Sequence, residues 1–144
     1  MHISPEKTIV KIAVKNATEE ILFLRRSDEH PLYKGQLDLP GGLSEKNEKP
    51  VETVTRELKE ETGLVIDSIP TLLFYKKILI SNETINYYLY FVNVGSLDSS
   101  NIKLSSEHKT IEMIPVNQIK NINLSQLTDN YILSAIDFLK QNPT

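Results

Sequence analysis

The sequence predicts a mixed α/β (α+β) fold, with one central mixed sheet and helices on its faces, formed by a single domain over residues 1–144. Two observations favour this class. Runs of β-branched and aromatic residues lie on both sides of one strongly helical segment, and an amphipathic helical pattern ends the chain. A chain of 144 residues is close to the commonest domain size, and no linker, low-complexity tract or repeat divides it.

The first elements are two strands and a loop. TIVKIAV (Thr8–Val14) and EILFLRR (Glu20–Arg26) have the composition of strands, and KNATE is the turn between them. The segment 27–42, SDEHPLYKGQLDLPGG, is rich in turn residues. It is predicted to be a long, partly ordered loop.

The strongest helical pattern lies over Pro50–Thr62. Proline is favoured in a first helical turn, and Gly63 just past the end suits a C-cap. Val51, Val54 and Leu58 fall within an arc of roughly 60° when each residue turns about 100°. These three residues are therefore the core-facing stripe of the helix.

The second half is predicted to contain a long hairpin, a strand and a helix. Thr71–Ile80 and Thr84–Val94 are rich in β-branched and aromatic residues and are separated by SNE. Thr110–Val116 has the composition of a short strand. Leu124–Gln141 is predicted to be an amphipathic helix, because apolar residues recur at positions 127, 131, 132, 135, 136 and 139.

Composition excludes several classes of function. A net charge of -3 leaves no overall basic field to hold a nucleic-acid polymer, although local cations could bind a small phosphorylated ligand. The chain has no cysteine, which excludes disulfides, thiol nucleophiles and thiolate metal sites. No apolar run approaches the roughly 18 residues of a membrane span, and the N-terminus lacks a secretory pattern. We therefore expect a cytoplasmic protein with no membrane partner.

Three glutamates on the predicted helix stand where local physics disfavours them. Glu57 and Glu61 are four residues apart beside the apolar stripe, and Glu60 lies on its far flank. Like charges at this spacing destabilise a helix by roughly 0.2–0.5 kcal/mol, and the helix dipole disfavours anions near its C-terminus. Either this face is merely solvated, or a cation binds there.

The acidic residues belong to a longer pattern of fixed spacing. Its positions hold glycine, glutamate, arginine and bulky aliphatic residues: Gly42, Glu48, Arg56, Glu57, Leu58, Glu60, Glu61, Gly63 and Leu64. At every specified position this stretch resembles the Nudix box, G-x5-E-x7-R-E-U-x-E-E-x-G-U, where U is a bulky aliphatic residue. The resemblance extends to ILFLRR and KGQLDLPGG before the box and to SSEHKTIEMIPV after it.

The resemblance implies a fold and a class of reaction. The expected fold is a Nudix-type α/β/α sandwich with a central mixed sheet, the box helix and a C-terminal helix. The expected reaction is hydrolysis of the diphosphate linkage between a nucleoside diphosphate and another moiety, X, with Mg²⁺ or alternatively Mn²⁺. The chain departs from the family where Leu37 and Met113 replace the usual Trp and Asn47 replaces the usual Gly. Asn tolerates the left-handed conformation better than other non-glycine residues.

The same resemblance implies which residues would bind the metal. Glu57 and Glu61 are the first candidates for ligands, followed by Glu60 and the Gly41 carbonyl. A cation held by oxygen ligands would reverse the local negative charge and bridge the substrate phosphates.

The remaining box residues are expected to support these ligands. Arg56 pairs with Glu48 in the family and would orient the carboxylates. Gly42 and Gly63 are structural positions of the box.

The general base stays open between carboxylates in two places. Family members use a glutamate of the box helix, here Glu57 or Glu60, or one on a later loop, here Glu107. His108 lies beside Glu107 and is expected to be solvated.

Other residues are candidates for substrate contacts. One of Arg25 and Arg26, at the end of a strand, is expected to meet a phosphate. One aromatic residue on each face of the predicted hairpin could stack on a base, and the candidates are Phe74, Tyr87, Tyr88 and Tyr90.

Two other functions are kept as alternatives: a Nudix-fold module that binds a nucleotide without turning it over, and an interaction domain with a solvated acidic helix. The substrate classes compatible with the chain are nucleoside triphosphates, dinucleoside polyphosphates and ADP-ribose. The absence of an additional N-terminal domain favours nucleoside triphosphates. The expected partner is a small nucleotide rather than a nucleic-acid polymer, and a homodimer is left open.

Overall fold

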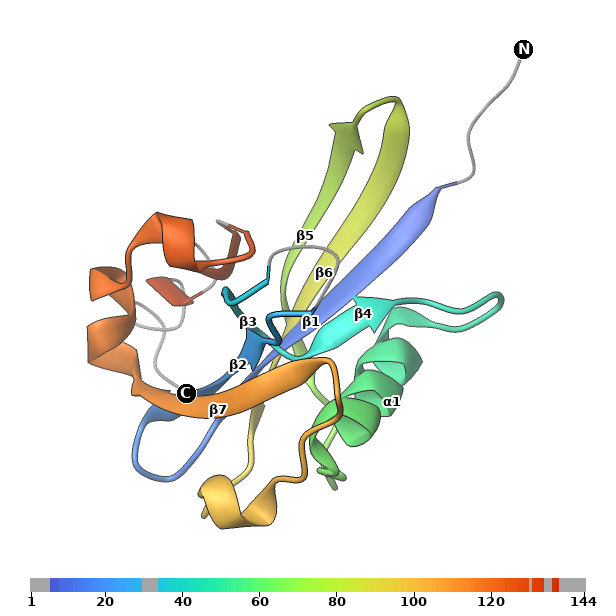
Figure 1. Cartoon of the computed structure of the whole chain (residues 1–144). Helices are drawn as coiled ribbons and strands as arrows, with labels where there is room; N and C mark the ends of the chain where they lie inside the picture. Colours follow the sequence, from blue (N-terminus) through green and yellow to red (C-terminus); the bar gives the residue numbers. More distant parts are fainter. Residues whose placement is uncertain (1–5, 30–33, 130, 134–135, 138–144) are drawn as a thin grey trace.

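The computed structural model describes residues 6–29, 34–129, 131–133 and 136–137. Its centre is a seven-stranded sheet in the order β3-β2-β1-β6-β5, in which β4 also pairs with β1 and β7 with β2 (Figure 1). The strands are β1 (Lys7–Lys15), β2 (Glu20–Arg26), β3 (Leu37–Asp38), β4 (Gly41–Leu43), β5 (Thr71–Ile80), β6 (Glu83–Asn93) and β7 (His108–Pro115). β1 and β6 are parallel and the other pairs antiparallel, so the sheet is mixed, as predicted.

The helix α1 (Pro50–Thr62) has the predicted bounds. Gly63 ends it with a φ of 77°, and its N–H donates to the carbonyl oxygen of Lys59 at 2.8 Å. At the other end, a Glu52 carboxylate oxygen accepts a hydrogen bond from the N–H of Lys49 at 2.9 Å. In the described parts of the chain, no helix combines the length and the apolarity that crossing a membrane requires.

α1 and the C-terminal segment cover opposite faces of the sheet (Figure 1). Successive residues of β2 alternate between these faces. Leu22 packs in the cluster that contains Leu58 of α1, whereas Phe23 packs in the cluster that contains Ile132. Because both faces are covered, the buried centre of β2, residues 21–24, is an unbroken apolar run rather than an alternating one. The fold is therefore the α/β/α sandwich that the resemblance implied.

Two short strands lie inside the segment 27–42, so the prediction of a loop is wrong there. β3 pairs with β2, and β4 pairs with β1. Strands of two and three residues are too short to show an alternating pattern, so the sequence carried no periodic signal for them. β4 matters for the site, because it lies against both β1 and α1.

The hairpin and the last strand differ from the prediction by one or two residues. β6 begins at Glu83 because Ser81 and Asn82 alone make the turn, with φ values of 50° and 66°. Two central residues with positive φ match the twist of the flanking strands. β7 begins at His108, two residues before the predicted start at Thr110.

The predicted helix over Leu124–Gln141 does not begin at its first residue. Leu124–Gln126 forms a 3₁₀ turn instead. Helical residues are present at 131–133 and 136–137, and residues 138–141 of the prediction lie outside the described residues.

Side-chain capping and strand pairing explain the later start. A carboxylate oxygen of Asp129 accepts hydrogen bonds from the N–H groups of Tyr131 and Ile132 at 3.0 and 3.2 Å. This is an N-cap, which starts a helix after Asp129. Just before it, Leu127 forms a parallel bridge with Leu37 and is extended rather than helical. Leu127, which fitted the helical spacing in the sequence, therefore pairs with a strand residue instead.

The loop between β4 and α1 contains Asn47 with a φ of 67°. This is the left-handed conformation that was expected where the family usually has Gly. Asn47 is exposed, so its conformation and not its packing determines which residues the position accepts.

We expect Asn47→Ala to lower the free energy of unfolding by about 1 kcal/mol, and Asn47→Gly to change it by less than about 0.5 kcal/mol. Alanine is strained at this φ, whereas glycine is not. Urea unfolding of both variants beside the original chain measures the difference. Equal losses in both variants would show that the Asn side chain stabilises the loop through a contact.

Candidate functional site

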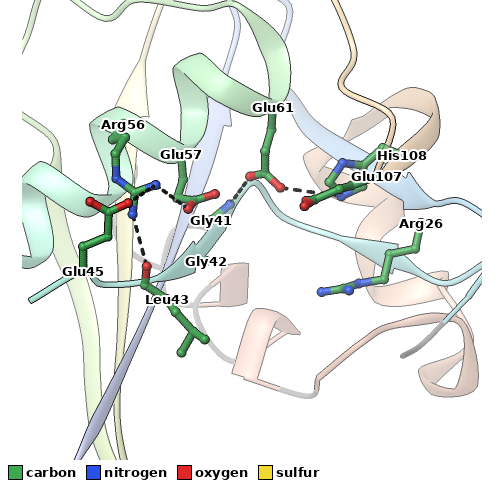
Figure 2. Close-up of a pocket in the computed structure, with 10 residues that line it drawn as sticks. All are labelled: Arg26, Gly41, Gly42, Leu43, Glu45, Arg56, Glu57, Glu61, Glu107 and His108. Carbon is green, nitrogen blue, oxygen red and sulfur yellow. Dashed lines mark hydrogen bonds and ion pairs between the residues drawn. The ribbon is translucent and has the colours of Figure 1, made fainter. Parts of the chain in front are cut away.

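Four parts of the chain line one acidic cavity of about 360 Å³ beside α1 (Figure 2). The lining residues come from β2, from β4 and the loop after it, from α1 and from the region where β7 begins: Arg26, Gly41, Gly42, Leu43, Glu45, Arg56, Glu57, Glu61, Glu107 and His108. Most of the predicted site residues therefore lie together.

Arg56 connects the loop before α1 to the helix itself. Its guanidinium makes a two-point contact with Glu48, at 2.8 Å from Nε to Oε2 and 3.1 Å from Nη2 to Oε1. Nη1 donates to Glu57 at 2.8 Å and to Glu60 at 3.2 Å, and Nη2 donates to the Leu43 carbonyl at 3.2 Å. The hydrogen bond from Arg56 is the main reason that the pKa of Glu48 falls to about 2. The Arg56–Glu48 pair implied by the resemblance is present.

Two adjacent glycines permit close contacts that the site requires. A Cβ on Gly41, whose φ is 154°, would lie 1.9 Å from the carbonyl oxygen of Val10. A Cβ on Gly42 would lie 2.7 Å from Cδ of Glu57. Gly41 therefore lets β4 approach β1, and Gly42 leaves room for the Glu57 carboxylate.

Glu61 is a buried carboxylate with one fixed oxygen. Its exposed fraction is 5%, and Oε1 accepts a hydrogen bond from the N–H of Gly41 at 2.7 Å. Burial raises the pKa of Glu61 to about 8, Glu57 adds to the increase, and Gly41 and Lys11 oppose it. Burial also raises the pKa of Glu57 against the effect of Arg56. A divalent cation that replaces a proton between these carboxylates would relieve the cost of burying them.

Backbone hydrogen bonds bring the start of β7 to the cavity. The N–H of Ser105 donates to the carbonyl oxygen of Glu61 at 3.2 Å, and the N–H of Ser27 donates to that of Glu107 at 3.0 Å. These bonds hold Glu107 and His108 opposite the end of α1 (Figure 2).

His108 is buried, so the expectation that it is solvated is wrong. Its side chain is 4% exposed, and Nε2 lies 3.7 Å from Oε2 of Glu61. Burial lowers the pKa of His108 to about 4, although Asp38 opposes this shift. The sequence prediction placed His108 in a loop, where a histidine is usually solvated. In the structure His108 is the first residue of β7.

The donor atoms in this cavity fit a divalent cation. One ligand atom each from Glu61, Glu107 and His108 lies within 4.8 Å of the other two. Glu57 lines the same cavity. Carboxylate oxygens are the donors that hard divalent cations bind.

The structure does not bring Glu60 or Arg25 to the cavity. Glu60 is 58% exposed and pairs with Arg56 at 3.2 Å. Arg25 makes a two-point contact with Glu112 at 2.7 and 3.0 Å and donates to the Gly35 carbonyl at 2.8 Å. Arg25 thus connects β2 to β7.

A second cavity, of about 400 Å³, adjoins the first. The two cavities share four lining residues: Arg26, Gly41, Gly42 and Leu43. The second also has apolar and aromatic walls, formed by Ile9, Ile78, Ile85, Tyr87 and Tyr131. Of the aromatic residues that we singled out, Tyr87 lines this cavity, and Tyr90 packs in the core beneath α1.

Two buried polar pairs lie in or beside the second cavity. Lys11 donates to both carboxylate oxygens of Asp38 at 2.5 Å, and Arg26 donates to one of them at 2.9 Å. Burial would raise the pKa of Asp38, but Lys11 and Arg26 hold it below its usual value. The Tyr87 hydroxyl donates to Asp129 at 2.9 Å, and burial raises the pKa of Asp129.

Sequence reasoning did not single out Lys11, Asp129 and Tyr131, which line the second cavity, or Asp38, which pairs with Lys11. Lys11 and Asp38 were visible as single charged residues within apolar runs, and such residues are usually paired when buried. Asp129 was visible as a capping residue before an apolar helical pattern. No pattern in the sequence indicated that Tyr131 lies beside Tyr87.

The fold and the acidic cavity agree with a comparison to known families. The model described as NUDIX domain matches residues 5–134, so the chain belongs to the Nudix family. It is a Nudix hydrolase. Nudix hydrolases act on small nucleotides and generally use divalent metal ions.

Individual relatives agree with this assignment. The chain is 27% identical, over 90% of its length and 93% of the relative's, to a Bacillus subtilis (strain 168) protein named "Putative 8-oxo-dGTP diphosphatase". Its structure is similar to that of the MutT protein from Methanosarcina mazei Go1, with a TM-score of 0.80, 25% identity and 100% of each chain covered. A C. elegans Ap4A hydrolase shares the fold, with a TM-score of 0.71, 13% identity and coverage of 93% and 95%.

We expect alanine substitutions at Gly41 and Gly42 to have different effects. In Gly42→Ala the new Cβ meets the movable end of Glu57, so Mn²⁺ affinity should fall about tenfold or more with a melting-temperature change below about 3 °C. In Gly41→Ala the new Cβ meets the backbone of Val10, so the melting temperature should fall by more than about 10 °C. Calorimetric Mn²⁺ titration and thermal unfolding measure the two effects. Equal losses of stability would contradict the distinction.

We expect Glu61→Gln to stabilise the metal-free protein, with a gain that grows from pH 5 to pH 8. The folded state keeps the Glu61 proton up to about pH 8, whereas the unfolded chain loses it near 4.5. Between these values the unfolded state binds fewer protons, so the original chain loses stability as pH rises. Glutamine does not titrate and can still accept from Gly41.

Thermal unfolding in chelator at pH 5 and pH 8 measures this gain. Glu60→Gln is the matched control, because that carboxylate is 58% exposed and its replacement should act equally at both pH values. A Glu61→Gln gain that does not depend on pH would contradict the electrostatic explanation.

Proposed function

We propose that the chain hydrolyses the diphosphate linkage of a nucleoside diphosphate joined to another group, with Mg²⁺ or Mn²⁺ as its ion. The observation that carries this proposal is the adjacency of two different cavities, one rich in carboxylates and one with aromatic walls, which share Arg26 and Gly41–Leu43. A substrate across this shared wall would have its phosphates at the carboxylate-bound ion and its base in the second cavity.

Glu57 and Glu61 are the proposed metal ligands from α1, with Glu107 opposite them. When bound, the ion would polarise the phosphoryl group and lower the pKa of an attacking water. Arg56 is a positioning residue in this proposal. It holds the Glu57 carboxylate at 2.8 Å while Glu48 fixes the other edge of its guanidinium.

Glu107 is the proposed general base. Glu57 is half-buried and hydrogen-bonded to Arg56, which favours a fixed, charged carboxylate. Glu107 is exposed at the rim of the same cavity, where a carboxylate can accept a proton and pass it to solvent. Glu60 supports Arg56 from the outer face of the helix in this scheme.

The proposed substrates are purine nucleoside triphosphates, oxidised ones included. The name of the Bacillus subtilis relative supports this class, and so does the chemistry of the second cavity. Tyr87 and Tyr131 offer aromatic surfaces for a base. Asp129 and Lys11 offer an acceptor and donors, which suit a base edge that carries both N–H groups and a carbonyl oxygen.

A nucleotide panel tests this proposal. Purified chain is incubated with about twenty nucleotides, 8-oxo-dGTP, Ap4A and ADP-ribose among them, and released pyrophosphate or mononucleotide is measured. We expect turnover of a purine triphosphate with Mg²⁺ or Mn²⁺ and none in EDTA, and a fall of about 10²-fold or more in Glu57→Gln. Tight nucleotide binding without turnover would instead support a binding module, and full activity in EDTA would end the metal-based mechanism.

We expect Glu107→Gln to lower kcat strongly with little change in KM, because a base acts mainly in the transition state. The acidic limb of the pH–rate profile should also disappear. Glu45→Gln is the matched control, since Glu45 is an exposed carboxylate on another side of the same cavity. If kcat and the acidic limb are both unchanged in Glu107→Gln, the base is a carboxylate of α1.

A further inference from the structure

His108 occupies a position that packing alone does not explain. Its side chain is 4% exposed and lines the acidic cavity beside Glu61 and Glu107 (Figure 2). Its buried Nδ1 has no hydrogen-bond partner among the described residues. Nε2 lies 3.7 Å from Oε2 of Glu61, which is too long for a hydrogen bond. Nε2, and not Nδ1, faces the Glu61 carboxylate, so Nε2 is the nitrogen that a ligand in the cavity would meet.

We propose that His108 supplies a nitrogen ligand to the divalent cation that Glu61 binds, with Glu107, the proposed base, beside the ion. One ligand atom from each residue lies within 4.8 Å of the others. Two atoms that each lie about 2.1 Å from one ion are roughly 3–4 Å apart, depending on the angle at the ion. The 3.7 Å separation between His108 and Glu61 therefore fits a shared ion.

The two oxygens of Glu61 have separate partners in this arrangement. Oε1 accepts the hydrogen bond from Gly41 at 2.7 Å, which fixes the carboxylate. Oε2 faces His108, so it is the oxygen directed to the shared ion. Oε1 of Glu57, the other proposed ligand from α1, accepts a hydrogen bond from Arg56 at 2.8 Å, which fixes that carboxylate as well. The inference rests on the divalent-cation site of the proposed function, but not on hydrolysis itself.

A nitrogen ligand changes which ion the site prefers. Mg²⁺ strongly favours oxygen ligands and keeps several waters. Imidazole binds later first-row ions more tightly, in the order Mn²⁺, Co²⁺ and then Ni²⁺. We therefore expect the site that contains Glu61 and His108 to bind Mn²⁺ and Co²⁺ more tightly than Mg²⁺.

Electron spin echo spectroscopy of the full chain loaded with Mn²⁺ tests the ligation directly. A directly bound imidazole should produce ¹⁴N modulation, which should change when the protein is labelled with ¹⁵N-histidine. The chain has three histidines, so the signal is assigned by its loss in His108→Gln. The measurement on the original chain does not depend on whether that variant folds.

Metal affinities provide a second measurement. Calorimetric titration should show that His108→Gln weakens Mn²⁺ and Co²⁺ binding about tenfold or more, and Mg²⁺ binding less than about threefold. Lys109→Gln is the matched control, because Lys109 is the next residue of β7, is exposed and pairs with Asp28 outside the cavity. Its affinities should stay at those of the original chain.

Absence of ¹⁴N modulation from the original chain overturns the inference, as does a signal that persists in His108→Gln. Equal weakening of Mg²⁺, Mn²⁺ and Co²⁺ binding also overturns it, because that pattern indicates a general structural effect. The proposed function has a separate outcome. Turnover in the nucleotide panel without ¹⁴N modulation removes only His108 from the metal site, and modulation without turnover removes only the hydrolytic proposal.

Discussion

The close approach of β4 to β1 and α1 is the constraint on which both cavities depend. Gly41 lets the backbone reach β1, and its N–H can then bond to the buried Glu61. Gly42 leaves the space that the Glu57 carboxylate occupies. The same short strand forms the wall between the two cavities. Replacing either glycine by a residue with a side chain would therefore disturb both the proposed metal site and the proposed pocket for the nucleotide base.

The negative charges in and beside α1 are not equally compensated by positive charges, and this difference suits the site to binding a cation. Arg56 pairs with Glu48, in the loop before α1, and with Glu60, on the outer face of α1. Glu61, one turn after Glu57, lies beyond its reach and is buried with one backbone donor. A site that leaves a carboxylate with so little compensation is suited to a cation, and the cation in turn suits an anionic substrate.

Much of this protein follows from contacts between residues close in the sequence. The bounds of α1, its C-cap at Gly63, the left-handed Asn47 and the Arg56–Glu48 pair all depend on local conformation or on a spacing of eight residues or fewer. The mixed sheet was also predictable, because its long strands have a distinct composition. Short strands such as β4 were not, since two or three residues show no period.

The sequence by itself determined the family pattern, the main helix and the long strands, because these depend on local preference and spacing. The sequence ranked Glu61 ahead of Glu60, but only the tertiary structure decided that Glu60 lies outside the acidic cavity and that Arg26 rather than Arg25 lines it. A step of one residue turns a side chain to a different face of a helix or strand, and distant segments determine which face is covered. His108 became part of the site for the same reason: the segment that precedes it is hydrogen-bonded to the end of α1.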